Sequence, residues 1–445
     1  MAVEHPSRPS PLDREAIAHL EVGQTSVSPG VVQALVWFFL LAIVTVPVFE
    51  VVSPGGAANG GVASWVRFGG IGNRVSEAFA NAPIGTPSRW SRAITANRVM
   101  LAELAAFEAA LEDGSRLGRT LRPPAQLLLT SWLGAGNERV YVGRGAWLFY
   151  RADTEHVTGP GFLAPAVRER RRAAASEWVS RPHPDPLPAI VDFARQLSDR
   201  GISLVLVPTP VKPSVHPGEF VEALADSREP VQNASYPAFV QAVRAAGIEL
   251  FDPAPVLVAN RRGGPQYLER DTHWRPEAME GVADALGSVI GERLPARLSD
   301  SAMRLVETSV TNAGDTATML DLPRRQLFYA PERVQIRRVV FADGSPWRPS
   351  RDADVLVMGD SFSNIYSLES MGWGTSAGFV EHLAHGLRRP VDRIVQNADG
   401  AFATRELLAQ GGPDRLAGTR LVIWQFATRE LSFGDWRPVD IPAAR

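Results

Sequence analysis

Two kinds of apolar pattern alternate along the second half of the chain. In one, apolar residues recur every three or four positions, as on one face of a helix; in the other, they form runs of four to six residues that are typical of buried strands. The expected helices cover residues 189–199, 236–245, the stretch after Pro276, 377–387 and a segment near Arg405, and the expected strands cover residues 202–207, 248–251, 354–358, 391–395 and 421–426. Repeated strand–helix units predict an α/β fold with a doubly wound, mostly parallel sheet. Residues 298–349 show no regular pattern, and we assign no element to them.

Near the N-terminus, residues 31–49 form a nearly continuous apolar run. Its length of about 19 residues is just enough for a helix to span the hydrocarbon core of a bilayer. A cleaved signal peptide and a buried core helix are the alternatives. A thirty-residue polar leader and the lack of an A-x-A cleavage site favour an uncleaved anchor over residues 31–52, with residues 1–30 as a tail.

The segment between this run and the alternating region has a different character. Residues 53–61 are rich in glycine and are expected to be a flexible exit from the membrane. Residues 98–111 carry apolar side chains at helical spacing and predict a packing helix. We therefore expect residues 53–135 to be a linker with membrane-proximal helices, and residues 136–445 to be the main domain.

Composition excludes several classes of function. The formal net charge of −2 gives no reason to expect nucleic-acid binding. The absence of cysteine removes disulfides, thiolate metal sites and cysteine nucleophiles. His382 and His385 lie three residues apart, but no third ligand is evident, so we expect no metal and no cofactor.

Two short motifs carry the candidate chemistry: DTHW at residues 271–274 and GDSF at residues 359–362. A serine hydroxyl becomes a good nucleophile when an imidazole takes its proton, and a carboxylate fixes the tautomer of that imidazole. Ser361 is the expected nucleophile, His273 the base and then the acid, and Asp271 the residue that orients His273. Taken alone, GDS is a common turn, and DTH can be a helix start with an ordinary buried histidine.

The position of each motif favours catalysis. Ser361 follows the predicted strand at 354–358, and ligands of open α/β sheets bind at the carboxyl ends of strands. His273 lies on the loop just before the helix that begins near Pro276.

Five further residues are candidates for binding the substrate or the oxyanion. Lys212, the sole lysine, follows the strand at 202–207, and Asn397 follows the strand at 391–395. Trp274 and Arg429 have side chains that suit sugar rings and carboxylates, and Tyr366 lies just past Ser361. Core packing is an equal alternative for Tyr366, as turn formation is for Asn397.

Together, these motifs resemble the alginate O-acetyltransferase AlgJ/AlgX-like family. The resemblance spans about residues 136–431 and includes the segments 136–150, 158–163, 207–213 and 314–315. It implies an SGNH-hydrolase-like, flavodoxin-like three-layer fold and transfer of an acetyl group to hydroxyls of an exopolysaccharide. It also implies a membrane-bound O-acyltransferase as the acetyl donor, and a single-pass protein of the bacterial inner membrane with a cytoplasmic tail and a periplasmic catalytic domain.

The residues themselves leave three functions open. The first is the membrane-anchored polysaccharide O-acetyltransferase. The second is a polysaccharide acetyl esterase or deacetylase, because the same triad can pass the acyl group to water. The third is a non-catalytic polysaccharide-binding or assembly protein, although a scaffold has no need of a triad.

Overall fold

The computed structural model describes residues 28–52, 61–80, 89–173, 182–294, 302–323, 326–397 and 400–442. The chain divides into two compact units, Met1–Thr120 and Leu121–Arg445. The sequence analysis expected the main domain to begin at residue 136, whereas this division falls within helix α5 (Arg116–Leu133).

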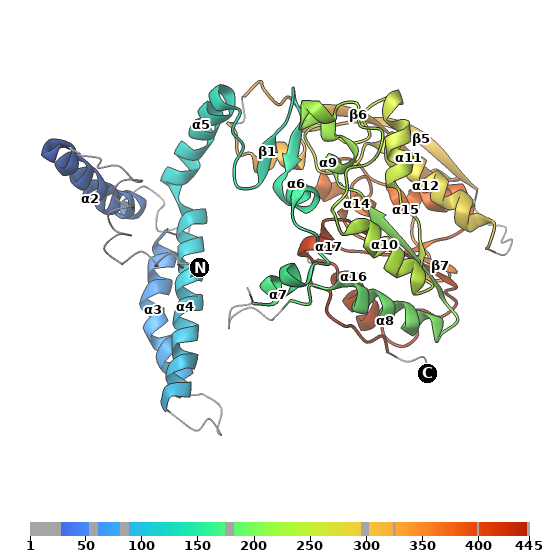
Figure 1. Ribbon diagram of the computed structural model, residues 1–445, viewed down its shortest axis with the longest axis horizontal. Coiled ribbons are helices and arrows are strands. Elements are labelled where there is room, and N and C mark those ends of the chain that lie inside the picture. The colour runs from blue at the N-terminus through green and yellow to red at the C-terminus, as the bar shows by residue number, and fades with distance from the viewer. Residues whose placement is uncertain are drawn as a thin grey trace, which may run out of the picture. The chain divides into compact units, whose positions relative to one another are not determined.

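The first unit is helical. It contains α2 (Pro29–Val52), α3 (Gly61–Ala80) and α4 (Arg89–Gly114), of which α3 and α4 pack side by side (Figure 1). An ion pair of 2.8 Å joins Arg74 of α3 to Glu103 of α4. The predicted apolar run forms α2, but among the residues that the structure describes no helix has both the length and the apolar character needed to cross a membrane. The anchor predicted over residues 31–52 is therefore not confirmed, and most of the glycine-rich exit lies outside the described residues.

A five-stranded parallel sheet forms the centre of the second unit. Its strands are β3 (Ser203–Thr209), β4 (Glu249–Leu250), β7 (Val355–Gly359), β8 (Asp392–Val395) and β9 (Leu421–Ala427). Their order across the sheet is β4-β3-β9-β7-β8. All neighbouring pairs are parallel, which confirms the predicted α/β class with a mostly parallel sheet.

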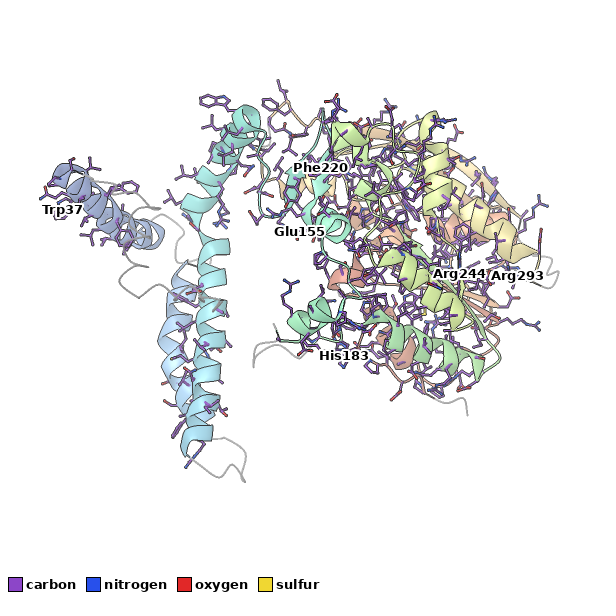
Figure 2. The ribbon with its side chains drawn as sticks, in the orientation of Figure 1. Trp37, Glu155, His183, Phe220, Arg244 and Arg293 are labelled. Carbon is purple, nitrogen blue, oxygen red and sulfur yellow. The ribbon has the colours of Figure 1, made fainter. Side chains whose placement is uncertain are left out.

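Helices cover both faces of this sheet. They are α8 (Pro186–Ser198), α10 (Tyr236–Ala245), α11 (Ala254–Asn260), α12 (Pro276–Gly291), α15 (Phe379–Leu387) and α16 (Ala403–Gln410). Figure 2 shows their outer side chains, such as the exposed Arg244 of α10 and Arg293 just beyond α12.

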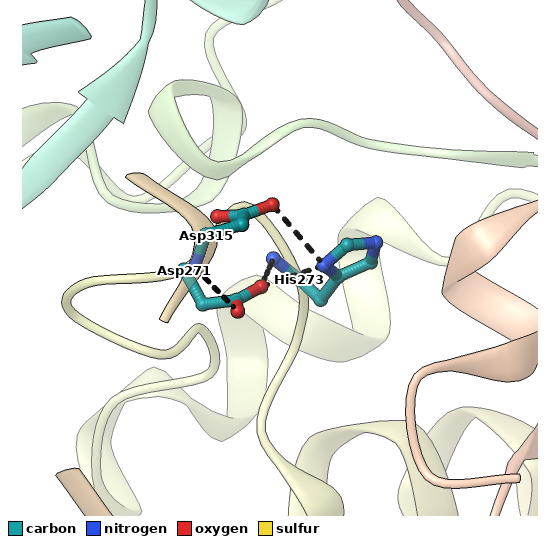
Figure 3. Close-up of side chains that lie close together, drawn as sticks. All are labelled: Asp271, His273 and Asp315. Atoms are coloured by element: carbon teal, nitrogen blue, oxygen red, sulfur yellow. Dashed lines mark hydrogen bonds and ion pairs between the residues drawn. The ribbon is translucent and has the colours of Figure 1, made fainter. Parts of the chain in front are cut away.

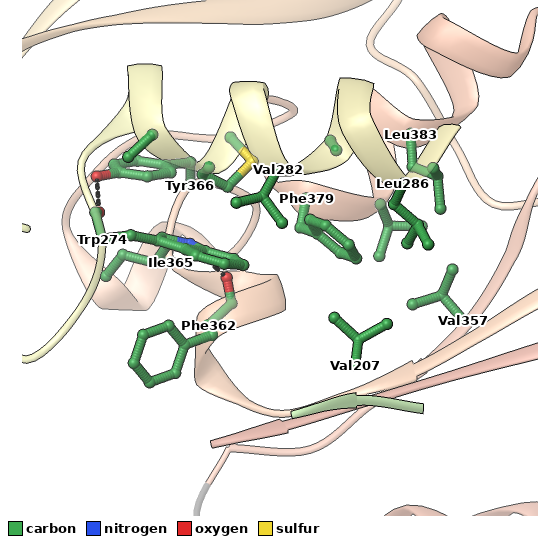
Figure 4. Packing of buried hydrophobic residues seen from close by; sticks show 14 of the residues in the cluster. Val207, Trp274, Val282, Leu286, Val357, Phe362, Ile365, Tyr366, Phe379 and Leu383 are labelled. Atoms are coloured by element: carbon green, nitrogen blue, oxygen red, sulfur yellow. Dashed lines mark hydrogen bonds between the residues drawn. The ribbon is translucent and has the colours of Figure 1, made fainter. Parts of the chain in front are cut away.

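Alternation along the strands divides the core between these two helix layers. Val207 of β3 and Val357 of β7 lie in the cluster with α12 and α15, and Figure 4 shows both beneath Leu286 and Phe379. Leu206, next to Val207, belongs instead to the cluster with α8 and α10. Burial of one such side chain stabilises the fold by about 1.5–3 kcal/mol. Because successive side chains of a strand point to opposite faces of the sheet, the two-residue period fixes which helices pack on which face.

Two antiparallel ribbons and several short helices complete this unit. β1 (Val140–Val142) pairs with β2 (Leu148–Tyr150), and β5 (Met303–Asn312) pairs with β6 (Glu332–Phe341). The short helices are α6 (Arg151–Thr158), α7 (Pro165–Ala173), α9 (Lys212–Val215), α13 (Asp315–Met319), α14 (Ser361–Asn364) and α17 (Glu430–Phe433). The β5–β6 ribbon corrects the expectation of an irregular stretch at residues 298–349.

Candidate active site

The GDSF motif forms a tight strand-to-helix turn at the carboxyl end of β7. Asp360 caps α14: one carboxylate oxygen, Oδ1, accepts hydrogen bonds of 2.9 Å from the Phe362 N–H and the Gln425 side-chain amide. Its other oxygen accepts from the Ala427 N–H of β9 at 2.7 Å. Because this carboxylate binds both its own turn and the neighbouring strand β9, Ser361 is fixed at the first position of α14.

Gly359 permits this turn to close. A Cβ atom at residue 359 would lie 2.3 Å from the Ser363 hydroxyl oxygen and 2.9 Å from the Gln425 side-chain oxygen. Those two oxygens belong to groups already hydrogen-bonded to each other at 2.7 Å. A larger residue would therefore displace the turn that presents Ser361.

The DTHW motif places a buried carboxylate–imidazole pair on the loop before α12. His273 Nδ1 lies 2.6 Å from Asp271 Oδ1, and both side chains are at most 4% exposed (Figure 3). The other Asp271 oxygen accepts hydrogen bonds from the Trp373 indole at 2.9 Å and from the Asp315 N–H at 3.0 Å. The carboxylate is thus held on both sides, and it in turn fixes the orientation of the imidazole.

The protonation states of this pair follow from its surroundings. Burial opposes charge on Asp271, but His273 and the hydrogen-bond donors around it prevail and lower the pKa of Asp271 to about 2. Burial also opposes charge on His273, but the Asp271 carboxylate outweighs it and raises the pKa of His273 above its ordinary value. An ionised Asp271 therefore accepts from Nδ1, which leaves Nε2 as the basic nitrogen.

Asp315 is a second carboxylate at this site, and we did not single it out as a functional residue from the sequence. Its two oxygens accept hydrogen bonds from the Thr272 N–H at 2.7 Å and from the Thr272 hydroxyl at 2.6 Å. One of them lies 3.8 Å from His273 Nδ1. Burial and the nearby Asp271 carboxylate raise the pKa of Asp315 to about 6. The sequence signal that could have identified Asp315 was the Gly314-Asp315 pair, one of the segments that resemble the family.

The second ring nitrogen of His273, Nε2, takes no part in the bond to Asp271. Nε2 is buried and has no hydrogen-bond partner among the described residues. The imidazole packs against the ring of Phe362, the residue that follows Ser361, with 4.9 Å between the ring centroids. No hydrogen bond joins Ser361 to His273 in the described part of the chain, so the complete triad stays a prediction.

Cavities open on both sides of this contact. Ser361 lines a small pocket of about 50 Å³ with Arg429 and Gln396. Asp271 and His273 line another of about 560 Å³, with Asp315 and Met371. Each half of the site therefore borders a cavity of its own.

Three of the predicted substrate-contacting residues belong to the interior instead. Trp274 and Tyr366 are fully buried, the Trp274 indole donates to the Phe362 carbonyl, and the Tyr366 hydroxyl donates to the Trp274 carbonyl (Figure 4). Lys212 is also fully buried and donates to two main-chain carbonyls, at 2.7 and 3.1 Å. Burial lowers the pKa of Lys212 to about 8. These side chains support the site by packing, and their contact with substrate stays a prediction.

Arg429 and Asn397 contact residues that follow Ser361 in the chain. The Arg429 guanidinium lies 5.8 Å from the centre of the Phe362 ring and pairs at 3.0 Å with Asp153, which is fully buried. Asn397 accepts a hydrogen bond of 3.0 Å from Asn364, the last residue of α14. Both residues therefore contact the nucleophile segment, and their roles in catalysis stay predictions.

The same three side chains could also hold a metal ion. One ligand atom from each of Asp271, His273 and Asp315 lies within 4.8 Å of the others. However, His273 Nδ1 and Asp271 Oδ1 already bond to each other, and three main-chain or indole N–H groups donate to the Asp271 oxygens. Donors directed at a carboxylate fit a hydrogen-bonded catalytic pair better than a metal centre.

Comparison with known proteins agrees with this geometry. Over residues 140–428 the sequence matches the family model described as SGNH hydrolase-like domain, acetyltransferase AlgX. The probable alginate O-acetylase AlgJ of Pseudomonas aeruginosa is 26% identical over 306 residues, which are 66% of this chain and 71% of that protein. The corresponding protein of Pseudomonas syringae pv. tomato is 26% identical over 307 residues, covering 66% and 70%.

A solved structure has the same fold. The O-acetyltransferase domain of Pseudomonas putida AlgJ aligns with a TM-score of 0.50 and 22% identity, over 67% of this chain and 94% of that domain. The family match covers well over half of the chain and includes both the DTHW and the GDSF motifs. The protein therefore belongs to the AlgJ/AlgX-like family of SGNH hydrolase-like acetyltransferase domains.

Proposed function

We propose that this protein is an O-acetyltransferase that carries an acetyl group on Ser361 and delivers it to a hydroxyl of an exopolysaccharide. One observation carries the proposal: the His273 imidazole is held by Asp271 on one nitrogen, has no partner within the described ranges on the other, and packs beside the turn that presents Ser361. Membership of an acetyltransferase family indicates that the transferred acyl group is acetyl.

In the first half of the reaction, the Ser361 hydroxyl attacks the carbonyl carbon of an acetyl donor. His273 Nε2 accepts the hydroxyl proton as the new C–O bond forms, and then gives that proton to the leaving group as the donor bond breaks. The Nδ1–H stays bonded to Asp271, which stabilises the imidazolium. The product is an acetyl ester on Ser361.

In the second half, a sugar hydroxyl attacks the acetyl-serine ester. His273 takes the proton of that hydroxyl and returns it to the Ser361 oxygen as the ester bond breaks. The oxyanion formed in each half needs preorganised hydrogen-bond donors. Deleting one such donor raises the activation barrier by about 3–4 kcal/mol. We propose the Ser361 N–H as one such donor and the Asn397 side-chain amide as another.

Location and acetyl supply are separate proposals that rest on the family resemblance. We propose that the domain works in the periplasm and receives acetyl groups from a membrane-bound O-acyltransferase. Fractionation of cells into cytoplasm, periplasm and membranes would test the location. Recovery of the protein in the cytoplasm alone would refute it.

The alternative of an acetyl esterase uses the same residues and differs only in the final acceptor. An experiment that separates the two gives the purified full chain 4-nitrophenyl acetate, with and without acidic or neutral oligosaccharides. We expect nitrophenol release to accelerate when an oligosaccharide acceptor is present, with acetylated sugar as the product. Acetate as the sole product with every acceptor would favour the esterase.

The nucleophile is tested in the same assay with Ser361→Ala. We expect this variant to lose both nitrophenol release and sugar acetylation. Ser198→Ala, which changes an exposed serine near the end of α8, is the matched control and should keep both. Activity of Ser361→Ala equal to the wild type would remove Ser361 from the mechanism, and a protein inactive in every arm would favour the scaffold alternative.

A further inference from the structure

The sole lysine of the chain holds the main chain that leads into the DTHW motif. Lys212 is the first residue of α9, and its side chain is fully buried. Its ammonium group donates to the main-chain carbonyl of Leu148, in β2, at 2.7 Å and to that of Glu269 at 3.1 Å. Glu269 lies two residues before Asp271. The lysine therefore bonds to the segment from which the candidate catalytic carboxylate extends.

Both main-chain polar groups of Glu269 are bonded. Its carbonyl also accepts from the Leu148 N–H at 2.9 Å, so β2 and Lys212 share one acceptor. Its N–H donates to a side-chain oxygen of Glu332, in β6, at 3.0 Å. Asp271 is thus preceded by main chain that α9, β2 and β6 all hold in place.

The loop that follows is closed at its base and tightly packed. The Leu268 N–H donates to the His273 carbonyl at 3.0 Å, which joins the two ends of the loop. A Cβ atom at Gly314 would lie 2.1 Å from the Arg270 carbonyl oxygen, so the turn before α13 approaches this loop as closely as a glycine allows. A displacement of the base would therefore pass directly to Asp271 and His273.

The charge of Lys212 strengthens these bonds and is kept at neutral pH. Burial lowers the pKa of Lys212, but nearby carboxylates limit the fall to about 8, so the ammonium form predominates at pH 7. Those carboxylates belong to Asp315, Asp271, Asp153 and Glu332. Hydrogen bonds from an ionised donor are roughly twice as strong as those from a neutral one. An ammonium group therefore holds the two carbonyls more firmly than a neutral side chain would.

We propose that Lys212 is a positioning residue for the Asp271–His273 pair and acts through the main chain of Glu269 rather than by touching substrate. This inference rests on the proposed function and adds to it a residue that lies outside both motifs. The two roles have different kinetic signatures. Loss of a substrate contact that is equally strong in the ground state and the transition state raises KM, whereas loss of positioning lowers kcat.

Steady-state acetyl transfer by the full chain, from 4-nitrophenyl acetate to an oligosaccharide acceptor, separates these roles. Lys212→Met keeps the length and the apolar stem of the side chain but removes every N–H donor. Because a misplacement of about 1 Å can lower a rate about 100-fold, we expect kcat to fall about tenfold to 100-fold, with the KM for the acceptor within about twofold of the wild type. A raised KM with normal kcat would overturn the proposal in favour of a substrate contact. Unchanged values of both constants would also overturn it.

Asn233→Leu is the matched control for the loss of a buried donor. Asn233 is buried and, like Lys212, donates to two main-chain carbonyls, those of His156 at 2.6 Å and Pro160 at 3.3 Å. We expect this variant to lose stability but to keep the kcat of the wild type per folded molecule. An equal fall of kcat in Asn233→Leu and Lys212→Met would assign the effect to general loss of stability and overturn the proposal.

A milder variant covers the case in which Lys212→Met does not fold. Lys212→Gln keeps an amide group that can donate, although on a shorter side chain and without charge. We expect its kcat to fall severalfold, less than in Lys212→Met, with an unchanged KM for the acceptor. A kcat equal to that of the wild type would overturn the proposal.

Proton NMR gives a readout that does not depend on acetyl transfer. The Nδ1–H proton of His273 lies in a buried bond of 2.6 Å to Asp271, so it should give a far-downfield signal that is absent from Asp271→Asn. We expect Lys212→Met to shift or broaden this signal and Asn233→Leu to leave it unchanged. If the signal responds to Lys212→Met in a protein that transfers no acetyl group, the proposed function is refuted and the positioning role remains. If acetyl transfer occurs and neither kcat nor the signal responds, the positioning role is refuted.

Discussion

Replacing Asp271 with asparagine tests how the His273 proton is placed. The two oxygens of Asp271 have different partners: one faces the imidazole, and the other accepts from the Trp373 indole and the Asp315 N–H. An amide NH₂ at the second position would oppose two fixed donors, whereas at the first position it would oppose only the His273 N–H. In Asp271→Asn the NH₂ group must therefore face His273 Nδ1.

That arrangement reverses the tautomer of the His273 imidazole. Nδ1 becomes an acceptor, the proton moves to Nε2, and the nitrogen that should take the serine proton no longer has a free lone pair. The equivalent change in serine-protease triads lowers kcat about 10⁴-fold. We expect a similar loss here, which corresponds to about 5.5 kcal/mol in the activation barrier.

The pH dependence gives an independent signature. In the wild type, Asp271 raises the pKa of His273, and only the neutral imidazole is a base, so activity should rise as pH increases through that pKa. Without the carboxylate the pKa of His273 falls, and the residual activity should reach its plateau at a lower pH than in the wild type. Initial rates of nitrophenol release between pH 4 and 9 would measure both effects, with Asp226→Asn at an exposed position as control. Activity within a few-fold of wild type, with an unshifted profile, would refute this reasoning.

Three further predictions concern the same site. Asp315→Asn should lower kcat about tenfold and shift the acid limb to lower pH by less than Asp271→Asn does, because the Asp315 carboxylate also raises the pKa of His273; a pH–rate profile identical to that of the wild type would contradict it. Gly359→Ala should lower the free energy of unfolding by about 1–3 kcal/mol in urea denaturation, because its Cβ would meet the Ser363 hydroxyl oxygen, whereas Gly263→Ala has open space and should change stability little; equal stability of the two variants would count against the close packing of this turn. Dialysis against EDTA should leave acetyl transfer unchanged, since the carboxylate–imidazole pair bonds to itself; activity that is lost and then restored by a divalent metal would show that the cluster is a metal site.

The main elements of the catalytic unit were predictable because burial imposes a period on the sequence. The expected helix at 236–245 has the same bounds as α10, and the expected strand at 421–426 is β9 to within one residue. In a buried strand or an amphipathic helix, the spacing of apolar residues shows which face is buried. The ribbon of β5 and β6 gave a weak signal. No residue of β5 is buried, and β6 alternates between buried and exposed residues only over 332–336, where the first buried side chain is the charged Glu332.

The candidate site was predictable only as far as its motifs extend. DTHW and GDSF made Asp271, His273 and Ser361 the candidate triad, because these two motifs contain the residue types that acyl transfer through a serine needs. Asp315 and Trp373 reach the site from other parts of the chain, and no local pattern shows that both bond to Asp271. Conversely, Trp274 follows His273 in sequence, but its side chain enters the core, since neighbouring residues on a loop need not point the same way.

The central claim is that an acetyl group rests on Ser361 between donor and acceptor. Rapid quenching of the protein after mixing with 4-nitrophenyl acetate, followed by proteolysis and mass spectrometry, tests it most directly. We predict one acetyl group per chain, on the peptide that contains Ser361, and its rapid loss when an oligosaccharide acceptor is added. The absence of any acetyl-enzyme, or an acetyl group that maps elsewhere and does not move to the sugar, would contradict the account.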